Sequence, residues 1–441
     1  IYTLSYTLSL HDALPISDAG EKFLNIRKLR GTSTQILLDL CDDLISHKGV
    51  ASGIALAREV MNRYNLLSIK EKLTFFKELN KKMGPDLESI KTVAQAFTDQ
   101  PNEKTLSDLS RQINSKRQEL FSRMIMAPMG TKAIVSLRED LLDFIPSNSN
   151  LETIDDELRG LLTAWFNPGF LVLRKIDWDT EASILEKIIQ YEAVHTIANW
   201  NDLKSRLTTN KRCFAYFHPA LDDEPLIFVE VALTKGITGS IQSIFNDQSI
   251  GEKEADTAIF YSINNCQRGL KKVPLGNFLI KMVVTQLASE LPSIKKYSTL
   301  SPIPGFADWL KDEIKSDSSE FITEEGRKLL KPLEDEAWYK DPKKSELLKK
   351  PLVNACAIYL IRVKKYNKPV NSVARFHFGN GAKLYRINWM GNTSEYGIAK
   401  SFGLMVNYLY DLKKIEANHE AYVQNGELAI SKTVKSILVM K

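Results

Sequence analysis

Apolar residues recur every three or four positions through the first third of the chain, where glycine is sparse. This spacing places them on one face of a helix. It predicts helices over residues 69–79, 106–124 and 154–165. Ser68 and Glu71 form a capping-box pattern at the start of the first. Because each stripe covers only one face, we expect a helical bundle over residues 18–165. Charge clusters there, such as Arg138-Glu139-Asp140, are interpreted as solvated faces.

The pattern changes after Asn167-Pro168-Gly169, where apolar runs typical of strands begin to alternate with helical stretches. We expect strands at 170–173, 213–217, 226–234, 257–263 and 297–300, and helices at 183–191 and 276–291. Residues 311–350, rich in Lys, Glu and Asp, predict a surface helical insertion, and 352–414 alternates helix-like and irregular stretches. The predicted fold class is α+β, with an all-α bundle followed by an α/β domain over 166–441.

The composition is that of a globular protein of more than one domain. The chain has 441 residues, of which 44% are hydrophobic and 26% charged, which excludes wholesale disorder. No apolar run approaches the ~18 residues that a membrane-spanning helix needs, so no membrane span is expected. The net charge of +5 gives no indication of nucleic acid as a partner. Four widely spaced cysteines favour a reducing compartment and argue against a structural zinc site or disulfide framework.

Residues 1–17 read IYTLSYTLSLHDALPIS, in which YTLS occurs twice. The segment has neither a basic n-region nor a small-residue cleavage site, so it does not match a secretory signal peptide. We interpret it as a non-native leader that resembles a translated sequencing adapter, with a native N-terminus as the alternative. If it is a leader, the native start is missing, and any targeting signal in it would be missing too. We expect a cytoplasmic protein, with a mitochondrial or other organellar location as the alternative.

A glycine-containing turn joins the strand at 257–263 to the helix at 276–291. Such a junction presents unpaired backbone N–H groups and the positive end of the helix dipole, which suit a pyrophosphate. Arg268, Lys271 and Lys272 would add positive charge. Neither GxxxxGK[ST] nor GxGxxG is present, and a purely structural junction is the alternative.

Two further segments carry candidate catalytic side chains. In STLSPIPGF (298–306), two prolines and a glycine fix the backbone and hold the Ser301 hydroxyl at a strand edge. The alternative is a rigid turn that Ser301 caps. In VARFHFGNGA (373–382), His377 lies between aromatic residues. The alternative to a catalytic role is a histidine buried in a strand and satisfied by backbone groups.

Several segments together resemble the malonyl-CoA decarboxylase family. They are FLVLRKIDW (170–178), DEPLIFVEVALT (223–234), SPIPGF (301–306), FHFGNGAKLYRINW (376–389) and SFGLMVNYLY (401–410). The resemblance implies a catalytic domain like the GCN5-type N-acetyltransferases (GNAT-like). It also implies conversion of malonyl-CoA to acetyl-CoA and carbon dioxide without a metal or other cofactor. The family is oligomeric, so we expect a homo-oligomer that forms through the helical domain.

The resemblance also assigns roles to individual residues. Ser301 and His377 match the family's catalytic pair. The acyl-CoA-binding loop matches Lys271, Lys272, Val273, Pro274, Leu275, Gly276 and Asn277. Lys187 matches a lysine needed for activity, although a helix-surface salt bridge would serve as well. Lys272 stands where the family's second loop glycine is expected, and a non-glycine residue with positive φ costs about 1 kcal/mol there.

The implied reaction leaves an enolate on the thioester when the carboxylate departs as carbon dioxide. We expect Ser301 to hydrogen-bond the malonyl group. His377, with a pKa near ~6.5, would protonate the enolate as the general acid. Two alternatives stay open: an acyl-CoA-dependent N-acyltransferase and a catalytically inactive CoA-binding regulator. The second stays open because Lys272 replaces the expected loop glycine.

Overall fold

The computed structural model describes residues 31–46, 49–246, 251–273, 275–316 and 318–439. Residues 1–17, interpreted above as a leader, lie outside the described residues. The described residues form two compact units. The first, here called the helical unit, runs to Leu171 and also includes His218–Asp222 and Gln267–Pro274. The second, the mixed unit, comprises Val172–Phe217, Asp223–Cys266 and the residues from Leu275 onward.

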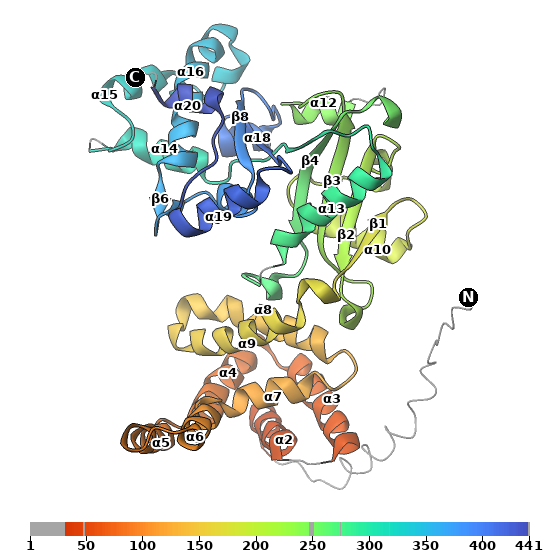
Figure 1. Ribbon diagram of the computed structural model, residues 1–441, viewed down its shortest axis with the longest axis vertical. Helices are drawn as coiled ribbons and strands as arrows, with labels where there is room; N and C mark the ends of the chain where they lie inside the picture. The colour runs from red at the N-terminus through yellow and green to blue at the C-terminus, as the bar shows by residue number, and fades with distance from the viewer. Residues whose placement is uncertain (1–30, 47–48, 247–250, 274, 317, 440–441) are drawn as a thin grey trace. The chain divides into compact units, whose positions relative to one another are not determined.

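The helical unit is built from amphipathic helices (Figure 1). They are α2 (Ser33–Ser46), α3 (Val50–Leu66), α4 (Ile69–Met83), α5 (Leu87–Asp99), α6 (Glu103–Ile113), α7 (Lys116–Met124), α8 (Gly130–Phe144) and α9 (Glu152–Trp165). The capping box at α4 is confirmed, because Ser68 Oγ accepts from Glu71 N and a Glu71 carboxylate oxygen accepts from Ser68 N at 2.9 Å. The single helix predicted over 106–124 is wrong, since Ser115 caps the start of α7 and separates it from α6.

The mixed unit contains a seven-stranded sheet in the order β1-β2-β3-β4-β5-β9-β8. Its strands are β1 (Val172–Ile176), β2 (Lys211–Phe217), β3 (Pro225–Thr234), β4 (Thr257–Asn265), β5 (Lys296–Thr299), β8 (Lys383–Asn388) and β9 (Met405–Leu409). Neighbours pair antiparallel except β4 and β5, which are parallel and joined by the crossover helix α13 (Gly276–Glu290). Two short strands of two residues each, β6 (Lys364–Lys365) and β7 (Lys368–Pro369), pair antiparallel in a separate sheet.

Further helices complete the mixed unit: α10 (Ala182–Tyr191), α11 (Trp200–Arg206), α12 (Ile241–Asn246), α14 (Phe306–Lys315), α15 (Glu324–Leu330), α16 (Pro342–Ile361), α17 (Ser372–Gly379), α18 (Glu395–Ser401), α19 (Ile415–Asn425) and α20 (Lys432–Val439). The predicted α+β class, a helical bundle followed by an α/β part, is confirmed, and the GNAT-like character of that part stays a prediction. The five predicted strands are present, the first as β1. Strands β8 and β9 were not predicted. No helix in the described ranges is long and apolar enough to span a membrane.

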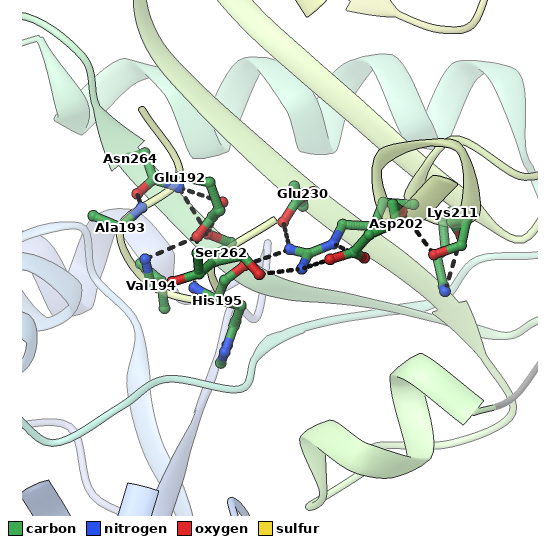
Figure 2. Close-up of polar contacts among 12 residues, drawn as sticks. Glu192, Ala193, Val194, His195, Asp202, Lys211, Glu230, Ser262 and Asn264 are labelled. Atoms are coloured by element: carbon green, nitrogen blue, oxygen red, sulfur yellow. Dashed lines mark hydrogen bonds and ion pairs between the residues drawn. The ribbon is translucent and has the colours of Figure 1, made fainter. Parts of the chain in front are cut away.

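A buried polar network ties the segment after α10 to strand β4, as Figure 2 shows. The Glu192 carboxylate accepts from Ser262 Oγ at 2.8 Å, from Asn264 Nδ2 at 2.7 Å and from the backbone N–H of His195 at 2.7 Å. Burial, followed by the charge of Glu192, raises the pKa of Glu230 to about 8. Arg206 bonds Glu230 at 3.3 Å and thereby joins β3 to α11. Glu230 Oε1 is buried without a hydrogen-bond partner among the described residues, whereas the bonds of Glu192 and Arg206 fix the arrangement of this buried sheet face.

Candidate active site

Ser301 and His377 lie side by side within the mixed unit. Ser301 follows β5, and His377 lies in α17, 76 residues further along the chain. Ser301 Oγ is 3.1 Å from His377 Nε2, and the two residues are 6% and 2% exposed. The alternative of a histidine buried in a strand and satisfied by backbone groups is wrong, since His377 is helical and its ring bonds side chains. The contact itself has the geometry that acid–base chemistry requires.

Four side chains form a continuous run of hydrogen bonds through this pair. The Ser301 hydroxyl donates to Thr299 Oγ1 at 2.8 Å, so it is not a cap of the following turn. Its one hydrogen is thereby used, and Ser301 Oγ accepts from the Nε2–H of His377. The other ring nitrogen, Nδ1, lies 2.8 Å from the Tyr410 hydroxyl and accepts its hydrogen. We call Tyr410, His377, Ser301 and Thr299 the hydroxyl–imidazole chain. It holds a neutral ring with its hydrogen on Nε2.

Burial keeps the imidazole uncharged. Desolvation lowers the pKa of His377 to about 3. The ring also stacks on Tyr408 with centroids 4.4 Å apart. Burial raises the pKa of Tyr410 well above its usual value, so the phenol stays a donor. The expectation that His377 titrates near ~6.5 is therefore wrong, because the charged ring would lose its hydration.

Asn371 links the turn that follows Ser301 to the helix that carries His377. Its side-chain oxygen accepts from Ala374 N at 2.8 Å and so caps α17. Its amide group donates to Pro304 O at 2.9 Å, and the Tyr359 hydroxyl donates to the same carbonyl at 3.0 Å. Asn371 is 1% exposed. An asparagine just before a helical stretch is an N-cap signal, and it is the feature by which the sequence could have revealed this residue.

Side chains replace part of the backbone ladder between β5 and β9. Ser301 exchanges two backbone hydrogen bonds with Val406, at 2.8 and 2.9 Å. One residue pair further along, Thr299 Oγ1 accepts from Tyr408 N at 3.1 Å, and Asn407 Nδ2 donates to Thr299 O at 2.7 Å. These bonds fix Thr299 and Ser301 against β9, the strand that Tyr410 directly follows.

The first part of the predicted acyl-CoA-binding loop belongs to the helical unit. Lys271 and Lys272 are exposed, and Val273 is buried. Lys272 has a φ of 66°, so it adopts the left-handed conformation for which a glycine was expected. A lysine in that conformation costs about 1 kcal/mol. Pro274 lies outside the described residues.

The second part of this loop belongs to the mixed unit. Leu275 is buried, and α13 begins at Gly276, with Asn277 in its first turn. Arg268, expected to add charge for a phosphate, instead pairs with Asp143 and, at 3.6 Å, with Glu139. Both carboxylates belong to α8, and the expectation that Arg268 adds charge for a phosphate stays a prediction.

The structure does not bring Lys187 to the serine–histidine pair. Lys187 lies on α10, where its ammonium is 3.2 Å from the Glu224 carboxylate and 3.1 Å from Asp223 O. Both partners belong to the connection between β2 and β3. The contacts are those of the helix-surface salt bridge considered as the alternative.

Two family models match the chain. The Malonyl-CoA decarboxylase C-terminal domain matches residues 169–441, and the Malonyl-CoA decarboxylase N-terminal domain matches residues 83–166. The first covers more than half of the sequence. The chain belongs to the malonyl-CoA decarboxylase family. The family predicted from the sequence is thus confirmed, and with it the enzyme class, a carboxy-lyase.

Individual members of the malonyl-CoA decarboxylase family are similar over most of their length. The mitochondrial enzyme of Anser anser anser is 39% identical over 352 residues, 74% of this chain and 70% of that protein. The mitochondrial enzyme of Rattus norvegicus is 35% identical over 345 residues, 72% of this chain and 70% of that protein. The crystal structure of malonyl-CoA decarboxylase from Rhodopseudomonas palustris gives a TM-score of 0.88 at 43% identity, covering 92% of this chain and 100% of that chain.

We predict that His377 makes the fold sensitive to acid. The native state keeps the ring neutral down to a pKa of about 3, whereas the unfolded chain takes up the proton near ~6.5. The unfolded state therefore binds more protons between these values, and stability falls as the pH falls through that window. We expect the free energy of unfolding, measured with urea, to fall between pH 7 and pH 5. This fall should be about 2 kcal/mol larger in the wild type than in His377→Gln. Equal losses in the two proteins would contradict a neutral buried ring.

Proposed function

We propose that this chain converts malonyl-CoA to acetyl-CoA and carbon dioxide, with Ser301 and His377 as its catalytic residues. One observation carries the proposal: a buried contact of 3.1 Å between these side chains, in a chain of the malonyl-CoA decarboxylase family. When the bond to the carboxylate breaks, its electron pair passes into the thioester as an enolate. The site must then offer hydrogen-bond donors to the developing charge and supply one proton to carbon.

In this proposal His377 works as a neutral acid. The hydroxyl of Ser301 and the Nε2–H of His377 exchange their resting partners for the bound malonyl group. A carbanion next to a thioester is more basic than a deprotonated imidazole, so proton transfer from the neutral ring to carbon is downhill. The Nε2 proton ends on the new methyl group, and solvent restores it after the product leaves. A histidine kept neutral by its surroundings is an established way to polarise a carbonyl.

We further propose that Lys271 through Asn277 bind the CoA portion. Support comes from the two exposed ammonium groups of Lys271 and Lys272 and from the α-helix that begins at Gly276. Lysine ammonium groups and helix N-termini are the groups that favour phosphate. Lys272 would take part through its charge in spite of its left-handed backbone.

Substitutions at the pair test the assignment. Ser301→Ala should lower kcat by about 10²–10⁴-fold, as loss of a positioned catalytic group does, and His377→Asn should lower it at least as much. The KM for malonyl-CoA should stay within about threefold, because the CoA contacts are elsewhere. The assay is release of acetyl-CoA and carbon dioxide from malonyl-CoA.

Lys187→Met is the control for this series. We propose that Lys187 supports activity only through the fold, by the salt bridge from α10 to Glu224. This variant should unfold at a lower temperature and keep kcat within about threefold of wild type. Near-wild-type turnover by Ser301→Ala or His377→Asn, or loss of turnover in folded Lys187→Met, would refute the assignment.

The same assay separates the alternatives. Malonyl-CoA alone should give acetyl-CoA and carbon dioxide. Turnover that needs an added amine would indicate an N-acyltransferase, and binding without turnover would indicate a CoA-binding regulator. Membership of the malonyl-CoA decarboxylase family favours the first outcome.

We also propose that the chain forms a homo-oligomer through its helical part, residues 18–165. None of the residues in α5 and α6 is buried, and these two helices lie at one end of the helical unit in Figure 1. Leu106 and Ile113 lie two turns apart on α6 and are 53% and 54% exposed. A second copy of the chain that covers this face would give α5 and α6 apolar contacts that they do not have within the described residues of one copy.

Leu106→Asp combined with Ile113→Asp should lower the mass measured by analytical ultracentrifugation. Leu329→Asp is the matched control, since Leu329 is 57% exposed in the mixed unit and outside the proposed interface. A monomeric wild type, or an unchanged mass in the double variant, would contradict the proposal.

The compartment stays a proposal as well. The expectation from the sequence is a cytoplasmic location, with a mitochondrial or other organellar one as the alternative. The goose and rat relatives are named as mitochondrial, which favours the alternative. Imaging of the natural full-length protein in its own cells distinguishes the two.

A further inference from the structure

A fully buried arginine of the helical unit holds the loop that precedes Pro274. Arg138 lies in α8, is 0% exposed, and bonds Asp155 of α9 through Nε at 2.8 Å. Its remaining nitrogens donate to the carbonyls of Gly269 at 2.5 Å and Lys271 at 3.0 Å. The sequence-based interpretation of Arg138 as part of a solvated face is therefore wrong.

The loop is pressed against α8 at the same point. A Cβ atom at Gly269 would collide with the backbone oxygen of Val135, so only glycine allows this approach. Burial of a guanidinium costs free energy unless its N–H groups are hydrogen-bonded. In Arg138, two nitrogens donate to loop carbonyls rather than to a second carboxylate. This use of a buried charge fixes the path of one short segment.

The direction of these bonds orients the loop's own donors. In a trans peptide the C=O and the following N–H point in opposite directions. Because Lys271 O points at Arg138, the N–H of Lys272 points away from it. Within the part of the chain that the structure describes, this N–H has no hydrogen-bond acceptor, whereas those of Leu270, Lys271 and Val273 are bonded within the loop.

We propose that Arg138 is a positioning residue for the phosphates of a CoA thioester, and that it aims the Lys272 N–H at one of their oxygens. This inference rests on the proposed function of the loop. An unpaired N–H beside an exposed ammonium is a donor pair suited to a phosphate oxygen. The left-handed conformation of Lys272, φ 66°, is then part of the geometry that presents this N–H.

Arg138→Lys tests the proposal, because lysine keeps the charge but cannot bond both carbonyls and Asp155 in the same geometry. The variant should raise the KM for malonyl-CoA about 10–100-fold, as loss of a hydrogen bond to a charged group does. The kcat should be unchanged. The KM for malonyl-pantetheine, which lacks the nucleotide phosphates, should also be unchanged.

Arg117→Lys is the matched control. Arg117 is also 0% exposed in the helical unit and bonds Glu157 at 2.8 Å, but none of its bonds reaches the loop. It should leave both KM values at the wild-type level. An equal rise for both substrates in Arg138→Lys, or a similar rise in Arg117→Lys, would show a merely structural role and overturn the proposal.

Two measurements keep the test independent of turnover and of folding of the variant. Calorimetric titration with CoA and with pantetheine should show the same selective loss in Arg138→Lys even if the chain decarboxylates nothing. In the wild type, CoA should slow amide hydrogen exchange across residues 270–273, and pantetheine should not. Absence of that slowing would overturn the proposal whatever the variant does, whereas slowing without decarboxylation would refute only the proposed function.

Discussion

The hydrogen bond between His377 and Ser301 is buried, and each of the two side chains has a second hydrogen-bond partner. A buried polar group that lacks a partner costs free energy, so the hydroxyl–imidazole chain is stable only if both of its ends are held. Tyr410, directly after β9, bonds one end, and Thr299, in β5, bonds the other. The register of these two strands and the position of α17 therefore follow from one requirement, that three segments meet around an uncharged ring.

The absence of charge in the hydroxyl–imidazole chain has a chemical consequence. A charged imidazolium would need a carboxylate beside it, and such a carboxylate would repel the anionic malonyl group. A neutral ring with its hydrogen on Nε2 offers a dipole instead, and dipoles act strongly where water is excluded. In the proposed reaction the Nε2–H group of His377 is therefore the acid. The Tyr410 hydroxyl favours this tautomer because it donates to Nδ1.

Local patterns were enough to predict most helices and strands. The assignment of Ser301 and His377 as a pair came from the resemblance to the malonyl-CoA decarboxylase family, and their contact across 76 residues depends on sheet order, which no short pattern encodes. Phe376 and Phe378 on either side of His377 imitate a strand, although Asn371 starts a helix there. Segments distant in the sequence bury both His377 and Arg138. The burial of His377 removes it from water and thereby lowers its pKa. A charged residue within a helix looks the same in sequence whether it faces solvent or a loop.

The protonation state of His377 tests this account most directly, and ¹⁵N NMR of selectively labelled histidine measures it. The account predicts one neutral form of His377, with hydrogen on Nε2, from about pH 5 to about pH 8. The His377→Gln spectrum would assign the signal. A signal from His377 that titrates to the imidazolium near ~6.5, or that carries its hydrogen on Nδ1, would contradict the account.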